Sequence, residues 1–62
     1  MNKYKIGDMV TVYFGNIPMI GPVVSIDEKR QKYLVRFNPH QQMYYSEAEL
    51  TPYTQPTRAK RG

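Results

Sequence analysis

The sequence predicts an all-β protein, a small and strongly bent antiparallel barrel of five strands. Two observations carry this prediction. Short segments rich in β-branched and aromatic residues alternate with period two, and glycine, proline and asparagine pairs separate them at hairpin spacing. The chain has 62 residues and no cysteine. It therefore has room for one small domain, held together by an apolar core and not by disulfides or thiolate-bound metal.

A first strand is predicted over 9–14, where every even position is β-branched or aromatic. Turn pairs, Gly7-Asp8 and Gly15-Asn16, stand on both sides of it. The next segment, 16–22, contains two prolines and Gly21, so we expect an irregular loop that does not join a central strand ladder. Its side chains are unusually apolar for a loop.

The second half of the chain shows clearer alternation, above all in Tyr33-Leu34-Val35-Arg36-Phe37. The elements expected there are a strand over 23–26, a charged connection over 27–32, a strand over 33–37, a turn over 38–40, a strand over 41–46, a 3₁₀ turn over 46–50 and a short strand over 51–53. Hairpin-sized connections of this kind favour a barrel.

The excess positive charge lies at the two ends of the chain. The formal net charge is +4, yet the stretch from Ile6 to Pro52 carries four basic and five acidic side chains. The other basic residues are Lys3, Lys5, Arg58, Lys60 and Arg61. We therefore expect a flexible N-terminus over 1–5, the domain over 6–53 and a disordered basic tail over 54–62.

Four motifs carry a family resemblance. They are Gly7-Asp8-x-Val10-x-Val12, Gly21-x-Val23-x-x-Ile26, Tyr33-x-Val35-x-Phe37, and Tyr45 followed by Glu49-Leu50-x-Pro52. Together they resemble the SH3-like barrel proteins and the KOW- or Tudor-like modules of bacteria and their phages, over about Ile6 to Tyr53. The resemblance implies an SH3-like barrel and does not specify a function.

No conventional catalytic or metal-binding set is present in the sequence. One histidine, five scattered carboxylates and no cysteine offer neither a nucleophile with its base nor a cluster of metal ligands. His40 follows a proline in a predicted turn, which favours an exposed position. We therefore expect a non-enzymatic protein without a cofactor.

One enzyme alternative rests on resemblance. Gly7-Asp8, Gly21, Tyr33-Leu34-Val35 and Gln42-Met43-Tyr44 are similar to segments of the type II dihydrofolate reductases, which are NADPH-dependent tetramers with a central pore. Two positions depart from that family. Val12 occupies the position of that family's pore lysine. The distance in sequence from Gln42 to Leu50 is one residue longer than the corresponding distance in the family. The charge that would hold the cofactor phosphates is therefore missing.

The aromatic content points to binding. Six tyrosines and two phenylalanines exceed what so small a core buries, and tyrosine suits surfaces that are apolar at one end and wet at the other. The residues expected to contact a protein partner are Tyr13, Ile17, Met19, Ile20, Leu34 and Tyr44. A second copy of the chain is another candidate occupant. Alternatively, these apolar residues have a structural role and no partner: the 16–22 loop folds back over the open end of the barrel and buries them.

Nucleic-acid binding is the alternative function. Its candidate contacts are Lys29, Arg30, Lys32 and Arg36 on the second hairpin and Arg58, Lys60 and Arg61 in the tail. Nearby glutamates weaken that positive field, and a charged hairpin also keeps a sheet edge soluble. No apolar run is long enough to cross a bilayer, and the first residues do not resemble a secretory signal, so the sequence predicts a cytoplasmic protein.

Overall fold

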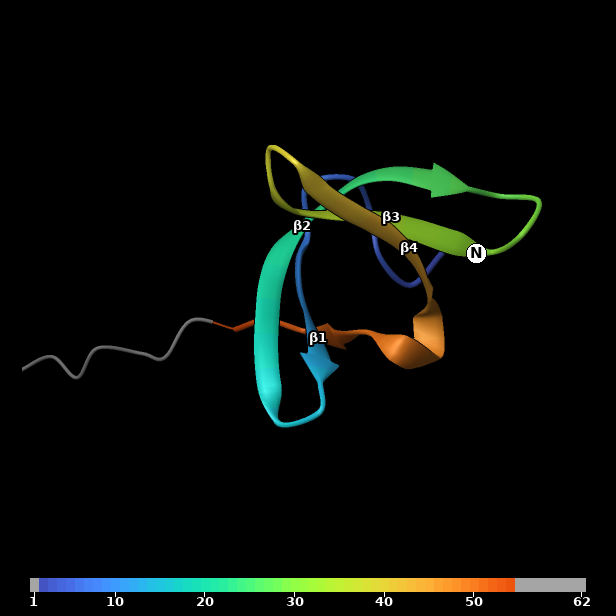
Figure 1. Ribbon diagram of the computed structural model, residues 1–62. Coiled ribbons are helices and arrows are strands. Elements are labelled where there is room, and N and C mark those ends of the chain that lie inside the picture. Colours follow the sequence, from blue (N-terminus) through green and yellow to red (C-terminus); the bar gives the residue numbers. More distant parts are fainter. Residues whose placement is uncertain (1, 55–62) are drawn as a thin grey trace, which may run out of the picture.

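The computed structural model describes residues 2–54, and these residues form one antiparallel sheet. The elements are β1 (Met9–Phe14), β2 (Ile17–Asp27), β3 (Lys32–Asn38), β4 (Gln41–Ser46), the 3₁₀ helix η1 (Glu47–Glu49) and β5 (Thr51–Pro52). The strand order is β4-β3-β2-β1-β5 (Figure 1). The predicted all-β class, its five antiparallel strands and the 3₁₀ turn before the last strand are confirmed. Within residues 2–54 no pairing joins β4 to β5, so the sheet is open.

The long strand β2 belongs to two hairpins. Its first half pairs with β1, up to Met9 opposite Pro22, and its second half pairs with β3, starting at Val23 opposite Val35. Figure 1 shows β2 curving between these hairpins, so that β1 and the first half of β2 project away from the layer of β3 and β4. Gly21 lies at the curve, where a Cβ would overlap the main-chain carbonyl of Arg36. Only glycine allows that close approach.

The prediction of an irregular loop over 16–22 is wrong, because residues 17–22 form a regular ladder with β1. Val23 donates its N–H to Asp8 O at 2.9 Å and accepts from Gly7 N at 2.8 Å, so its polar groups face the β1 side. Strand alternation turns the nitrogens of Pro22 and Pro18 to the opposite side. Pairing with β3 begins only at Val23, so neither proline removes a ladder hydrogen bond.

The core lies between the inner faces of the two hairpins. Its buried members are Tyr4, Val10, Val12, Val23, Tyr33, Val35, Tyr45 and Leu50, with Ile26 and Phe37 packed against them. The inward positions expected from alternation, Val10 and Val12 on β1 and Tyr33 and Val35 on β3, are therefore confirmed. Phe37, expected on the same face, is half-buried.

The packed region reaches back beyond the domain start expected at Ile6. Tyr4 is buried, and its ring meets Tyr33 edge to face with centroids 5.4 Å apart. The Tyr4 hydroxyl donates to Leu50 O at 3.3 Å, and Lys3 N donates to the Tyr33 hydroxyl at 3.1 Å. These contacts tie the N-terminal segment to β3 and to the end of η1. Of the tail expected over 54–62, all but Thr54 lies outside the described residues.

Two buried tyrosine hydroxyls differ in their partners, which predicts opposite effects of removing them. The Tyr45 hydroxyl has no hydrogen-bond partner among residues 2–54, and burial, with Glu49 second, raises the pKa of Tyr45. We expect Tyr45→Phe to leave the free energy of unfolding unchanged or raise it by about 1 kcal/mol, because a desolvated hydroxyl is removed. Tyr4→Phe should lower it by about 1 kcal/mol, because Leu50 O loses its donor.

Urea unfolding followed by circular dichroism measures both effects. Equal losses in the two variants would contradict the assignment of an unpartnered hydroxyl to Tyr45.

Candidate functional site

The hairpin formed by β1 and the first half of β2 exposes large apolar side chains and carries no charged residue. Residues 9–26 contain no Asp, Glu, Lys or Arg. Its exposed large apolar side chains are Met9, Tyr13, Phe14, Ile17 and Ile20, which we call the apolar hairpin patch. Tyr13 and Ile17 are 60% and 62% exposed. Soluble monomers rarely expose large contiguous apolar patches, and those that they do expose often mark interaction sites.

Four residues of the patch lie toward the tip of the hairpin, and Met9 lies at its other end, opposite Pro22. Tyr13 pairs with Pro18 and Thr11 pairs with Ile20, so Tyr13 and Ile20 are diagonal neighbours on the outer face. On the inner face, Phe14 pairs with Ile17 at the tip. The two faces meet at the turn that joins β1 to β2, which makes the hairpin tip apolar on both sides.

Aromatic contacts anchor the tip to the core. The Phe14 ring meets Phe37 edge to face with centroids 6.1 Å apart, and Phe37 meets the buried Tyr45 at the same separation. Met19 is half-buried opposite Val12. The patch therefore sits on a hydrogen-bonded ladder with a packed inner side, which holds its side chains in place before any partner arrives.

The structure divides the six expected partner contacts between two hairpins. Tyr13, Ile17, Met19 and Ile20 lie on the β1–β2 hairpin. Leu34 and Tyr44 are cross-strand partners on β3 and β4, where Leu34 is half-buried and Tyr44 is 50% exposed. The structural alternative, in which residues 16–22 cover the open end and are buried, is wrong for Ile17 and Ile20, both of which are exposed.

Sequence reasoning missed four exposed apolar side chains, Ile6, Met9, Phe14 and Met43. Alternation places Phe14 and Met43 on the inner face, in line with Val12 and Val35. Phe14 is nonetheless 42% and Met43 55% exposed, so an inward direction alone does not bury these side chains. The sequence signal that could have found Phe14 is the lack of charged residues at the tip that follows it.

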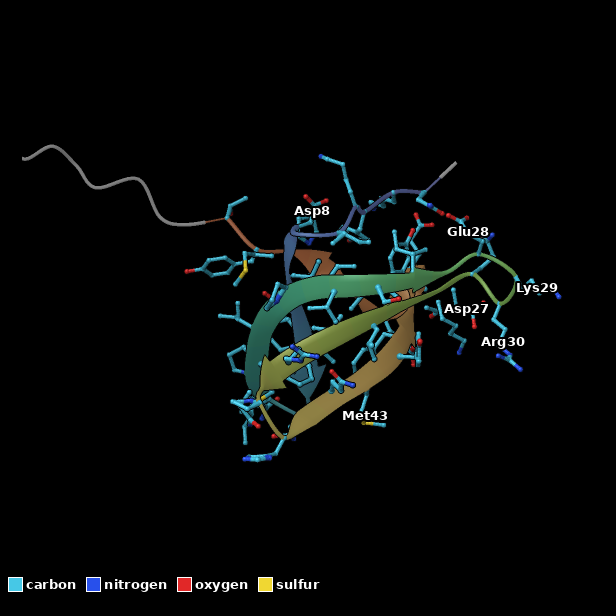
Figure 2. All side chains as sticks on the ribbon, turned by 90° about the horizontal axis from the view of Figure 1, so that it is seen from above. Asp8, Asp27, Glu28, Lys29, Arg30 and Met43 are labelled. Atoms are coloured by element: carbon cyan, nitrogen blue, oxygen red, sulfur yellow. The ribbon has the colours of Figure 1, made fainter. Side chains whose placement is uncertain are left out.

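Among the described residues, the basic side chains expected to contact nucleic acid lie at the β2–β3 turn and on β3. Arg30 is held in the β2–β3 turn by Asp27, with Nη1 3.2 Å from the carboxylate. Figure 2 shows Asp27, Glu28, Lys29 and Arg30 together at this turn. The Arg30 main-chain N–H and side chain lower the pKa of Asp27. Two acidic side chains therefore lie beside two basic ones at the turn.

The two other basic candidates lie on β3 and face β4. Arg36 Nε donates to Gln42 Oε1 at 2.9 Å, and Lys32 is paired with Ser46. Glu49 caps η1 by accepting from Ser46 N at 2.8 Å, and this bond is the main reason that the pKa of Glu49 is lowered. Lys32 adds to that effect. The tail candidates Arg58, Lys60 and Arg61 lie outside the described residues.

Residues 2–54 contain no group of three His, Cys, Asp or Glu side chains that could hold a metal ion. His40 lies exposed in the β3–β4 turn, where its N–H donates to Asn38 Oδ1 at 2.9 Å. The part of the chain that the structure describes has no helix of the length and hydropathy that a membrane span needs.

Comparisons of the chain with protein-family models, with curated proteins and with solved structures find no match.

Proposed function

We propose that this chain is a non-enzymatic, SH3-like interaction module that binds a protein partner through the apolar hairpin patch. The observation that supports this is the exposure of five large apolar side chains on a hairpin with no charged residue over 9–26. Burial of such surface is favourable by about 25 cal/mol per Å². The SH3-like barrel is part of the proposal, and the bent β2 shared by two hairpins supports it.

The chemistry of the patch favours a protein surface over a phosphate backbone. Tyr13 and Phe14 are aromatic, and rigid aromatic side chains dominate the binding energy of protein interfaces. Nucleic-acid binding draws mainly on Lys and Arg, which the patch lacks. The partner that fits is a protein with an apolar groove or a complementary apolar face.

The test uses the immobilised full chain as bait in a lysate of its source cells, with quantitative mass spectrometry of what is retained. The hairpin variant carries Tyr13→Lys and Ile17→Lys. The control variant carries Ala48→Lys and Thr54→Lys, which add the same two charges at exposed positions outside the patch. We expect one protein to be retained by the natural chain and by the control, and its retention by the hairpin variant to fall about 30-fold or more.

The salt dependence of retention distinguishes protein binding from nucleic-acid binding. Retention through the apolar patch should hold or increase between about 0.1 and 0.5 M NaCl, whereas phosphate contacts weaken steeply over that range. Retained RNA or DNA that is lost with salt and is equal for both variants would assign the chain to nucleic-acid binding. Equal retention of every protein by the two variants would refute the proposal.

A further inference from the structure

The free edges of the sheet differ in how they are protected. Beside β5, the free edge is two residues long and includes Pro52. Along the first half of β2, the side away from β1 carries Pro18 and Pro22, which have no N–H to offer. The part of β1 beyond its pairing with β5 is only three residues long, Val12 to Phe14. Short strands and prolines are the usual devices against edge-to-edge pairing.

Strand β4 has none of these devices. Its six residues, Gln41 to Ser46, include no proline and no charged side chain. Among the described residues it pairs only with β3. Met43 is 55% and Tyr44 50% exposed. In Figure 2, Met43 extends from β4 away from the ribbon of β3. A long, uncharged and partly apolar free edge is a template for another strand.

The free main-chain groups of β4 can be identified. Ser46 N donates to the Glu49 carboxylate, so it faces away from β3. Because successive residues of a strand direct their polar groups to alternate sides, the N–H and C=O of Tyr44 and Gln42 face the same free side. Ser46 N is already used by Glu49, which leaves Gln42 and Tyr44 to pair with a new strand.

We propose that a second copy of this chain pairs antiparallel with the β4 edge, about a twofold axis at Met43. In this register Gln42 of each copy lies opposite Tyr44 of the other, and each pair exchanges both of its main-chain hydrogen bonds. Every free group of these two residues is then used. A register centred on Tyr44 would place Gln42 opposite Ser46, whose N–H is already taken by Glu49.

The side chains at position 43 are also compatible with a twofold axis there. The two Met43 side chains face each other in a non-hydrogen-bonded pair, the closer type of cross-strand pair, and shield each other from water. Strand β4 itself carries no charged side chain, so the pairing places no like charges of β4 directly opposite each other. One strand pair is smaller than a standard interface, so we expect a dimer with a Kd in the micromolar to millimolar range. The pairing is independent of the partner proposed for the apolar hairpin patch.

Sedimentation equilibrium of the full chain between about 10 μM and 2 mM tests the dimer. The Met43→Lys variant places two like charges across the axis and should weaken dimerisation at least 10-fold. Tyr13→Lys is the matched control, because it adds the same charge at a similarly exposed position on the other hairpin. It should dimerise like the natural chain.

Amide hydrogen exchange of the natural chain supplies a second measurement that needs no variant. Exchange of the Gln42 and Tyr44 amides should slow as the concentration rises from the monomer to the dimer range. A chain that stays monomeric throughout, or exchange at these two amides that does not change with dimerisation, overturns the proposal. So does a dimer that Tyr13→Lys abolishes and Met43→Lys leaves intact, since association would then use the apolar hairpin patch.

Discussion

Gly21→Val is expected to unfold most of the protein at room temperature. A Cβ at this position would overlap the carbonyl oxygen of Arg36, which is main chain and cannot rotate away. The only relief is to separate β2 from β3 at the curve where the two hairpins meet, and that opens the core around Val23 and Val35. We expect a loss of about 3 kcal/mol or more, most of the stability of a domain this small.

The measurement is urea or thermal unfolding followed by circular dichroism, with Gly15→Ala as control. Gly15 has a φ of +63° and nothing within 4 Å of an added Cβ. Its replacement should therefore cost about 1 kcal/mol from backbone strain alone. If Gly15→Ala is as damaging as Gly21→Val, the close approach to Arg36 is not what requires glycine at position 21.

Tyr4→Ala is expected to lower the free energy of unfolding by about 3–5 kcal/mol, as truncation of a buried aromatic side chain does. Tyr4 is only 4% exposed, and the variant loses both the edge contact with Tyr33 and the hydrogen bond to Leu50 O. The cavity would open between the N-terminal segment and β3. Residues before Ile6 are therefore part of the folded unit.

Tyr13→Ala is the matched control, because it removes the same side chain from a position that is 60% exposed. Its effect on stability should stay within about 0.5 kcal/mol. Urea unfolding of the two variants gives the comparison. Similar small effects in both would show that the segment before Ile6 contributes nothing to the core.

The candidate site was partly predictable from the sequence. Alternation within β1 and β3 predicts that Tyr13 and Leu34 lie opposite the buried valines, and the structure has them on that outer face. Whether an outer or inner position is exposed depends on what covers it. Leu34 is half-buried on the outer face, whereas Phe14 is 42% exposed on the inner face, although its ring contacts Phe37.

By itself, the sequence determined the all-β class, the number of strands and the sides of β1 and β3 that face the core, since all three follow from local alternation and turn residues. Tertiary structure decided the rest. Residues 17–22 are a strand because the prolines turn their nitrogens to a side without a partner, and Tyr4 joins the core because Tyr33 and Leu50 O lie within its reach. Both outcomes depend on neighbours distant in sequence, which a local pattern does not contain.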